Sequence, residues 1–387
     1  MVLYRTIDIG GGTGRFATAE VDRRKQVTLK TIQAKAEKFN GGRELIEMCT
    51  KNLTAEKFAA RQNRVVISIA GPVNTEAGTI VKLTNQTGIE ERDIPLASEL
   101  EASLMESNGR KIKVDLINDG TAGTYAELSA QGALAGLDNG SLAMALIIGN
   151  GVGGGLNQVV KGQIKPMPGA HELGHFPIPK SVLDRSQLTK LLPAELKCGC
   201  QTVWNARTSA TICLDSAAKG PTMKAIFQNL MRETLWQGYW DTATSEILGV
   251  VKNGREMGSD EAVGELTNQH ITEVLEKSKG NNSLCQRVLS GQAAMLAYRL
   301  AAMQRGYDNL GPINVALIGG IGLAWGPKIV DHINKAFDEM ATRSEIPVWG
   351  NRPEVRVGNF AAAETNLYGN IFYMQSQEPK ELLRIKC

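Results

Sequence analysis

The sequence predicts an α/β protein built from two domains. The chain has 387 residues, which is enough for more than one domain. Two glycine-rich turns, DIGGGTGRF at Asp8–Phe16 and GNGVGGG at Gly149–Gly155, each follow a short apolar segment typical of a strand. From about residue 215 the apolar residues take helical spacing. We therefore expect two strand-rich lobes, each with a glycine turn, and a nucleotide in the cleft between them.

Composition narrows the class of protein. An apolar fraction of 42% and a charged fraction of 21% allow a large globular core. The net charge of +3 gives no reason to expect nucleic acid or an acidic membrane as a partner. No apolar run has the length of a membrane span, and the N-terminus lacks the pattern of a signal peptide. Six scattered cysteines do not suggest a disulfide framework, so we expect a cytoplasmic protein.

The first glycine turn fits neither of the two common nucleotide motifs. Counted from Gly10, the sixth position of G-x-G-x-x-G is Arg15, and no Gly-Lys-Ser/Thr ending is present. The segments FATAEVD and QVTLKTI that follow read as strands rather than as a helix. We therefore expect a turn between antiparallel strands whose backbone amides form a nest for phosphate. Asp8 either orients Mg²⁺ through water or only hydrogen-bonds the turn.

The remaining elements follow in order. LAMALII and LNQVVKG flank the second glycine turn and form a weak repeat of the first hairpin, and a third glycine turn ends INVALIGGIG. RVVISIAGPVN and KVDLINDG read as strands with turns, whereas LASELEASLMES, GTAGTYAELSAQGAL, SLCQRVLSGQAAMLAYRLAAMQRGYD and AAETNLYGNIFYMQ read as helices. The chain shows no linker, so we place the boundary at a hinge that is crossed twice. The expected domains are 1–125 with the C-terminal helix at about 362–387, and 126–361.

Asn118 and Asp119 end the strand KVDLIND. Side chains at strand ends of α/β proteins reach the binding cleft, where a carboxylate can take the proton of an attacking hydroxyl. The alternative is that Asp119 caps the helix that begins at Gly120 or Thr121.

HELGH, at His171–His175, has the letters of a zinc-protease motif. PMPGA precedes it and FPIP follows, so we expect a loop rather than the required helix. A carboxylate and an imidazole on a loop suit the hydroxyls of a polyol. Cys198 and Cys200 are either half of a zinc site, completed by His175 or His171, or two reduced thiols, and Cys213 is a further candidate nearby.

The order of these motifs resembles the ROK family of sugar kinases (repressors, open reading frames, kinases). The resemblance rests on DIGGGTGRFA, VVISIAGPVN, LTNQTGI, VDLINDGTAGTYAE, IIGNGVGGGL, PGAHELGHFPI, CGC and VALIGGIG, which span nearly the whole chain. It implies the two-domain, actin-like (ribonuclease H-like) ATPase fold of the actin, Hsp70 and hexokinase superfamily, with nucleotide and sugar in the interdomain cleft.

The resemblance also implies a role for each matching residue. Asp119 would be the catalytic base, and the sugar would be bound by Gly71, Asn85, Asn118, Glu172 and His175. The nucleotide would be bound by Asp8, Gly10, Gly11, Gly12, Thr13, Gly149, Asn150, Gly151, Gly153, Gly154, Gly319 and Gly320. The family's zinc motif is cut short here, since Gly199-Cys200 is followed by Gln201 and Thr202. A structural zinc ion on His175, Cys198 and Cys200 is therefore left open.

The expected function is ATP- and Mg²⁺-dependent phosphorylation of a hexose at C6, with domain closure around the sugar and with a homodimer as the assembly. The alternatives are a sugar-responsive regulator of the same family or a protein that binds sugar without catalysis. A repressor would need a helix-turn-helix ahead of the first strand, and that strand is expected to begin at about residue 2. The polar residues at Asn85, Glu172 and His175 favour a protein with a sugar substrate.

Overall fold

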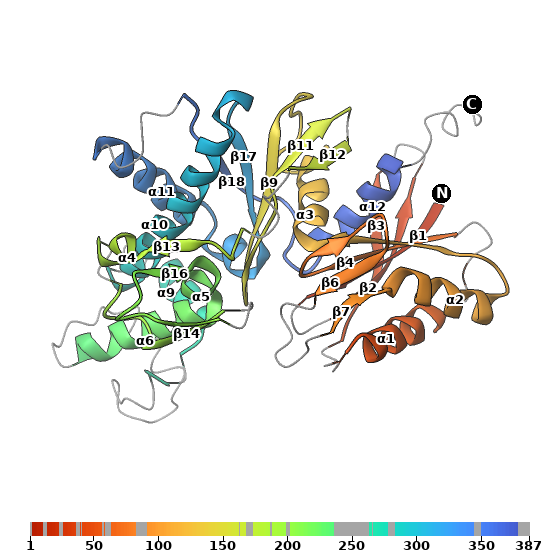
Figure 1. Ribbon diagram of the computed structural model, residues 1–387, viewed down its shortest axis with the longest axis horizontal. Helices are drawn as coiled ribbons and strands as arrows, with labels where there is room; N and C mark the ends of the chain where they lie inside the picture. Colours follow the sequence, from red (N-terminus) through yellow and green to blue (C-terminus); the bar gives the residue numbers. More distant parts are fainter. Residues whose placement is uncertain are drawn as a thin grey trace. The chain divides into compact units, whose positions relative to one another are not determined.

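The structure is a computed structural model that confirms the α/β class (Figure 1). It describes residues 2–10, 14–22, 26–35, 39, 41–55, 58, 63–82, 91–161, 163–167, 173–185, 188–198, 202–235, 263–264, 266–277, 283–343 and 350–377. The chain divides into two compact units. The first unit comprises Met1–Leu146, Gly153–Glu172 and Gly358–Cys387, and the second comprises Ile147–Val152 and Leu173–Val357. The domain boundaries expected from the sequence stay a prediction.

The first unit contains a five-stranded sheet in the order β3-β2-β1-β4-β8. Its strands are β1 (Val2–Ile9), β2 (Gly14–Val21), β3 (Val27–Lys35), β4 (Arg64–Ile69) and β8 (Lys113–Asn118). β1, β2 and β3 pair antiparallel, which confirms the hairpin expected around the first glycine turn. β4 and β8 continue the sheet in parallel with β1.

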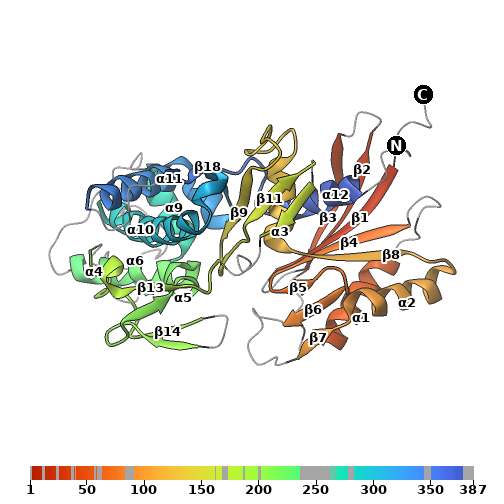
Figure 2. The same cartoon turned by 45° about the horizontal axis from the view of Figure 1, so that its top comes forward.

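Helices cover both faces of this sheet (Figure 2). On one face α1 (Gly42–Thr54) and α2 (Leu96–Asn108) bury Leu45, Leu100 and their neighbours against Ile7 and Ile67. On the other face α3 (Asp119–Leu128) and the C-terminal α12 (Thr365–Gln377) pack against strand residues such as Val66. Since successive strand residues point to opposite faces, β4 supplies Val66 to one core and Ile67 to the other. A small sheet of β5 (Val73–Asn74), β6 (Thr79–Lys82) and β7 (Arg92–Ile94) completes the described part of this region.

A second sheet has the order β12-β11-β9-β17-β18, with β10 paired to β9. Its strands are β9 (Leu142–Ile148), β10 (Val152–Gly153), β11 (Asn157–Val160), β12 (Gln163–Pro166), β17 (Ile313–Ile318) and β18 (Glu354–Val357). β9 and β11 pair antiparallel, so the second glycine turn lies in a hairpin as the sequence predicts. β17 and β18 are parallel, and all six residues of β17 are buried, as expected for a central strand.

The second unit is rich in helices, as the spacing of apolar residues after residue 215 predicts. Its further elements are β13 (Pro177–Pro179), α4 (Lys180–Arg185), β14 (Glu195–Lys197), β15 (Val203–Asn205), β16 (Thr211–Cys213), α5 (Leu214–Ala218), α6 (Gly220–Leu235), α9 (Asn268–Lys277), α10 (Ser283–Gly306), the 3-10 turn η1 (Asp308–Leu310) and α11 (Gly319–Thr342). α11 kinks at Gly326, with φ 47°, because Pro327 disfavours a helical residue before it. The Trp236 and Trp240 segment lies outside the described residues.

The helices predicted from LASELEASLMES, SLCQRVLSGQAAMLAYRLAAMQRGYD and AAETNLYGNIFYMQ are confirmed as α2, α10 and α12. Within the described residues, no helix combines the length and apolar character that crossing a bilayer requires.

Removal of a core side chain from β4 should destabilise the protein strongly. Ile67 is fully buried, whereas Ile32 in β3 is 38% exposed, which makes Ile32 a matched control. We expect Ile67→Ala to lower the free energy of unfolding by about 2–5 kcal/mol because it leaves a cavity. Ile32→Ala should change it by about 0.5 kcal/mol or less. Urea unfolding of both variants measures the difference, and equal destabilisation would contradict the placement of Ile67 in the core.

Candidate active site

Three parallel strands of the first unit end at one edge of the sheet. Ile9 in β1 is in register with Ile69 in β4, and Ile69 is in register with Asn118 in β8. Adjacent strands lie about 4.8 Å apart, so the residues that follow these positions gather within a short distance. The gathered residues include Gly10, Gly71 and Asp119, each of which the sequence assigns to nucleotide, sugar or catalysis.

Asn118 rather than Asp119 caps the helix α3. Its Oδ1 accepts the backbone N–H groups of Gly120 at 2.8 Å and Thr121 at 3.3 Å. Its Nδ2 donates to the carbonyl oxygen of Gly71 at 2.8 Å, so the cap is also tied to the end of β4. The alternative that Asp119 serves as the cap is therefore corrected. The Asp119 carboxylate accepts the adjacent N–H of Gly120 at 2.8 Å, and the side chain is half-buried.

The start of α3 touches the end of the second glycine turn. A Cβ atom on Gly120 would lie 2.9 Å from the Cα of Gly154 and 3.2 Å from the N of Gly155. Gly154 has φ +139°, and its own Cβ would meet the carbonyl oxygen of Ala145 at 2.6 Å. Only glycine allows both approaches. The residue next to Asp119 is thus in backbone contact with the segment expected to hold phosphate, entirely within the first unit.

Asp8 is buried in a polar network that sequence reasoning did not identify. Its carboxylate accepts from Arg15 Nη1 at 2.8 Å, Ser68 Oγ at 3.0 Å and Asn366 Nδ2 at 2.9 Å. Arg15 lies opposite Asp8 in the β1–β2 register, and Ser68 lies beside it in β4. Asn370, one helical turn after Asn366, donates to Thr6 Oγ1 at 2.7 Å and to Ser68 Oγ at 3.1 Å. The i, i+4 spacing of two asparagines in TNLYGN is the sequence signal that could have pointed to this network.

The first half of the second glycine turn contacts the start of α6, at Gly220, and the residue before it contacts the start of α11, at Gly319. Gly149 donates its N–H to the carbonyl oxygen of Gly151 at 2.9 Å and accepts the N–H of Gly220 at 2.7 Å. Asn150 between them is exposed. Gly319 has φ +85°, and a Cβ there would lie 2.7 Å from the carbonyl oxygen of Ile148. Gly319 and Gly320 are the first residues of α11, so the third glycine turn connects a strand to a helix.

His175, Cys198 and Cys213 form a cluster of metal-ligating atoms in the second unit. His175 Nδ1 lies 3.0 Å from Cys198 Sγ and 3.9 Å from Cys213 Sγ, and the two sulfurs are 3.2 Å apart. A hydrogen bond from Cys198, together with His175, lowers the pKa of the Cys213 thiol to about 5. By contrast, burial raises the pKa of Cys49 to about 12. The thiolate is the form that binds metal, so the chemistry of Cys213 suits a metal ligand, whereas Cys49 is a core residue.

This cluster fits a zinc ion. The donor atoms all lie within 4.8 Å of one another, and one imidazole with thiolates is a common zinc ligand set. Cys213 in β16, a further candidate in the sequence, takes the third place in the cluster; Cys200 itself lies outside the described residues. Since His175 Nδ1 faces the sulfurs, a sugar contact by His175 would have to use Nε2. The described part of the HELGH motif, Leu173–His175, is a turn, as predicted.

Several predicted site residues lie outside the described part of the chain. These are Gly11, Gly12, Thr13, Asn85, Glu172 and Cys200, together with His171. Their roles stay predictions.

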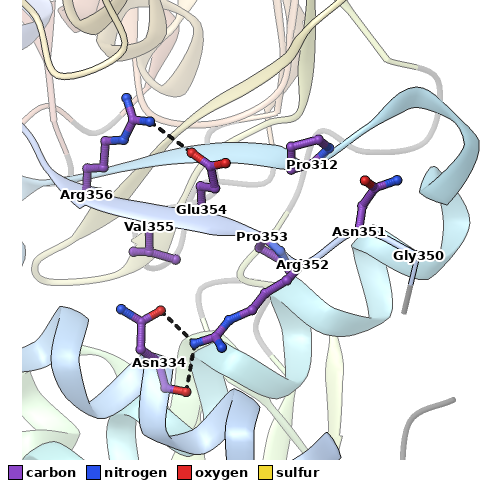
Figure 3. Close-up of a pocket in the computed structure, with 9 residues that line it drawn as sticks. All are labelled: Pro312, Asn334, Gly350, Asn351, Arg352, Pro353, Glu354, Val355 and Arg356. Carbon is purple, nitrogen blue, oxygen red and sulfur yellow. Dashed lines mark hydrogen bonds and ion pairs between the residues drawn. The ribbon is translucent and has the colours of Figure 1, made fainter. Parts of the chain in front are cut away.

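A surface pocket in the second unit is lined by residues of β18 and of the segments before β17 and β18 (Figure 3). It opens where β17 and β18 begin, near Pro312 and Glu354, whereas Gly319 follows the far end of β17. Six strand residues separate these ends by about 20 Å. Its arginines are engaged, since Arg352 bonds Asn334 and Asp338 and Arg356 bonds Glu354. The pocket is therefore separate from the third glycine turn at Gly319.

The chain matches the ROK family over residues 4–349 and belongs to that family. A ROK family glucokinase from Streptomyces griseus, solved with glucose and AMPPNP, has a TM-score of 0.66 at 18% identity, with 96% of this chain and 98% of that chain covered. The ROK hexokinase from Thermus thermophilus has a TM-score of 0.57 at 20% identity, covering 98% and 100%. A ROK family transcriptional regulator, a homolog of the E. coli MLC protein, has a TM-score of 0.61 at 15% identity, covering 97% and 80%.

These likenesses establish the fold, which is the actin-like two-domain α/β fold of the ROK sugar kinases. Among curated proteins, none matches this sequence.

Replacement of Cys213 should weaken metal binding. We expect the purified protein to carry about one zinc ion per chain, and Cys213→Ser to lose most of it because one of the thiolates is gone. Cys285→Ser is the control, since Cys285 is buried in α10 and is not part of the cluster. Elemental analysis of zinc per chain checks this. Full zinc content in Cys213→Ser would show that Cys213 is not a ligand, and zinc-free wild-type protein would show that the cluster is only a set of reduced side chains.

Proposed function

We propose that the protein is a sugar kinase that transfers the γ-phosphoryl group of ATP to the C6 hydroxyl of a hexose. The observation that carries the proposal is the contact between the start of α3 and the second glycine turn. Asp119 precedes Gly120, and Gly120 packs against Gly154 and Gly155. A carboxylate that can take a proton and a turn of backbone amides that can bind phosphate are the two groups that suit phosphoryl transfer to an alcohol.

The glycine segments are suited to ATP as substrate. Gly154 and Gly319 adopt positive φ at positions where a Cβ atom would strike a neighbouring carbonyl oxygen. Glycine turns of this kind carry no side chains, so a phosphate group can approach their backbone closely. Gly10, Gly11, Gly12 and Thr13 would supply the first phosphate turn, and Gly149, Asn150, Gly151, Gly153 and Gly154 the second. Gly319 and Gly320 would lie near the adenosine.

Asp8 is the acidic side chain that we assign to the Mg²⁺ that accompanies ATP. The ion supplies neutralisation of charge on the phosphates. The Asp8 carboxylate accepts hydrogen bonds from Arg15, Ser68 and Asn366, which fix its orientation near the end of β1. A magnesium role is compatible with a contact through water, because Mg²⁺ keeps much of its hydration shell.

Asp119 would accept the proton of the sugar hydroxyl as it attacks the γ-phosphate. The N-cap made by Asn118 supports this role. Because Asn118 caps the start of α3, the Asp119 side chain is not needed as the cap. Asn118 and Gly71, joined by a hydrogen bond, would orient the sugar beside it. Asn85, Glu172 and His175 are the further sugar ligands that we propose. A zinc ion on His175, Cys198 and Cys213 would fix the turn that carries His175.

The structural relatives support the same activity. The Streptomyces glucokinase is described with glucose and AMPPNP, and the Thermus protein is a hexokinase. A regulator is the second candidate, because the MLC homolog has the same fold. The two are distinguished by turnover: a regulator binds sugar without releasing ADP. Closure of the domains on sugar, a homodimeric assembly and a cytoplasmic location stay predictions.

The deciding experiment is a sugar-dependent ADP-release assay over several hexoses, with and without a zinc chelator. Release of ADP that depends on one hexose, with the 6-phosphate as product, supports the kinase. Sugar binding in the absence of any ADP release favours the regulator or a non-catalytic sugar-binding protein. The effect of the chelator reports whether the cluster contributes.

Substitution of the proposed base should impair turnover more than binding. We expect Asp119→Asn to lower kcat by about 10²-fold or more, with sugar affinity largely kept, because the amide cannot accept the proton. Asp138→Asn, a change at an exposed position, is the control for loss of one negative charge. Steady-state kinetics and calorimetric sugar binding measure both effects. Near-normal turnover in Asp119→Asn would refute the assignment of the base.

A further inference from the structure

Asp215 is a buried acidic residue that none of the roles above uses. It lies in α5, two residues after Cys213, and is 5% exposed. A buried carboxylate is costly unless its oxygens are hydrogen-bonded, so its contacts indicate why it is tolerated. Each of the contacts described below lies within the second unit.

The two oxygens of this carboxylate face two different structures. Oδ1 accepts the backbone N–H of Val152, in the second glycine turn, at 2.9 Å. Oδ2 lies 3.6 Å from Sγ of Cys198, in the metal-ligating cluster. One side chain thus connects the turn expected to hold phosphate with the cluster expected to hold zinc. The N–H of Val152 points at Asp215, so this amide orients the turn rather than contacting phosphate.

The backbone around Asp215 reinforces the connection. Its N–H donates to the carbonyl oxygen of Gly174 at 2.7 Å, and Cys213 Sγ lies 3.3 Å from the same oxygen. A Cβ on Gly174 would lie 2.0 Å from the carbonyl oxygen of Val152. A Cβ on Gly151 would lie 3.0 Å from Oδ1 of Asp215. The cluster, Asp215 and the turn therefore pack too closely for one to shift without the others.

We propose that Asp215 is a positioning residue that couples the His175, Cys198 and Cys213 cluster to the second glycine turn, so that metal in the cluster strengthens nucleotide binding. The coupling rests on the proposed function, because it assigns the turn to nucleotide phosphate. A metal ion fixes Cys198 and Cys213, these fix α5, and Asp215 then holds Val152 in place. A hydrogen bond to a charged acceptor is strong enough for this purpose.

The test combines amide exchange with nucleotide affinity in the absence of sugar. In Asp215→Ala we expect the Val152 amide to exchange about tenfold faster or more, and the dissociation constant of a non-hydrolysable ATP analogue to rise about tenfold. Asp215→Asn keeps one acceptor oxygen and should show a smaller change. Hydrogen exchange read by mass spectrometry and isothermal calorimetry give the two values, with circular dichroism to confirm the fold.

Chelation of zinc separates coupling from general stability. In the wild-type protein, a chelator should speed up Val152 exchange and raise the dissociation constant of the ATP analogue, as Asp215→Ala does. In the Asp215→Ala variant the chelator should change either value little further. Asp308→Asn is the matched control. Like Asp215, Asp308 accepts backbone N–H groups, those of Asn351 at 2.9 Å and Gly350 at 3.3 Å. It lies before the start of β17, whereas the third glycine turn follows the end of that strand. This variant should leave Val152 exchange and nucleotide affinity unchanged.

Two results would overturn the proposal. One is a folded Asp215→Ala protein with wild-type Val152 exchange and nucleotide affinity. The other is a chelator effect that persists in full in Asp215→Ala. Failure of the proposed function gives a different pattern: the wild-type protein would bind no nucleotide, while Val152 exchange would still respond to Asp215→Ala.

Discussion

Close approach of backbone to backbone at glycine is the constraint on which the site depends. Four glycines lie so close to the hairpin of β9, the second glycine turn and β11 that a Cβ atom on any of them would clash with its backbone. The distances from that Cβ atom would be 2.9 Å for Gly120 (to Gly154), 2.0 Å for Gly174 (to Val152), 2.8 Å for Gly220 (to Gly149) and 2.7 Å for Gly319 (to Ile148). Each of these contacts joins the β9 hairpin to another segment of its own unit. Interiors are packed too tightly for such clashes to be absorbed without movement of the chain. The glycines therefore fix where the hairpin lies, and the polar side chains are placed around it.

Much of the fold is readable from local pattern. Alternation in FATAEVD predicts β2, the apolar run LAMALII predicts β9, and the helical spacing in LASELEASLMES predicts α2. These signals are strong because each element is buried on a defined face, which the period of apolar residues records directly. Asn118 and Asp119 are also found from sequence, because they end a recognisable strand. The choice between them as helix cap needs coordinates, because both are good capping residues.

The remaining parts of the site depend on contacts between residues far apart in the chain. The sequence offers Cys213 as a further candidate but gives no reason to group it with His175 and Cys198, because only the pairing of β13 with β16 brings Cys213 beside His175. Asp215 carries no sequence signal of its own, since its partner Val152 is 63 residues away. Spacing along the chain cannot reveal such pairs; the folding of a loop back onto a hairpin creates them.

The network around Asp8 has a consequence for the order in which the chain folds during synthesis. Asn366 and Asn370 belong to α12, and they bond residues of β1 that are 358 and 364 positions earlier. A ribosome releases the N-terminal strands first, yet the polar centre of their sheet receives its amide donors only after the more than 350 residues up to α12 have been made. Until then Asp8, Thr6 and Ser68 lack these partners, so the N-terminal sheet completes its folding only after α12 has been synthesised.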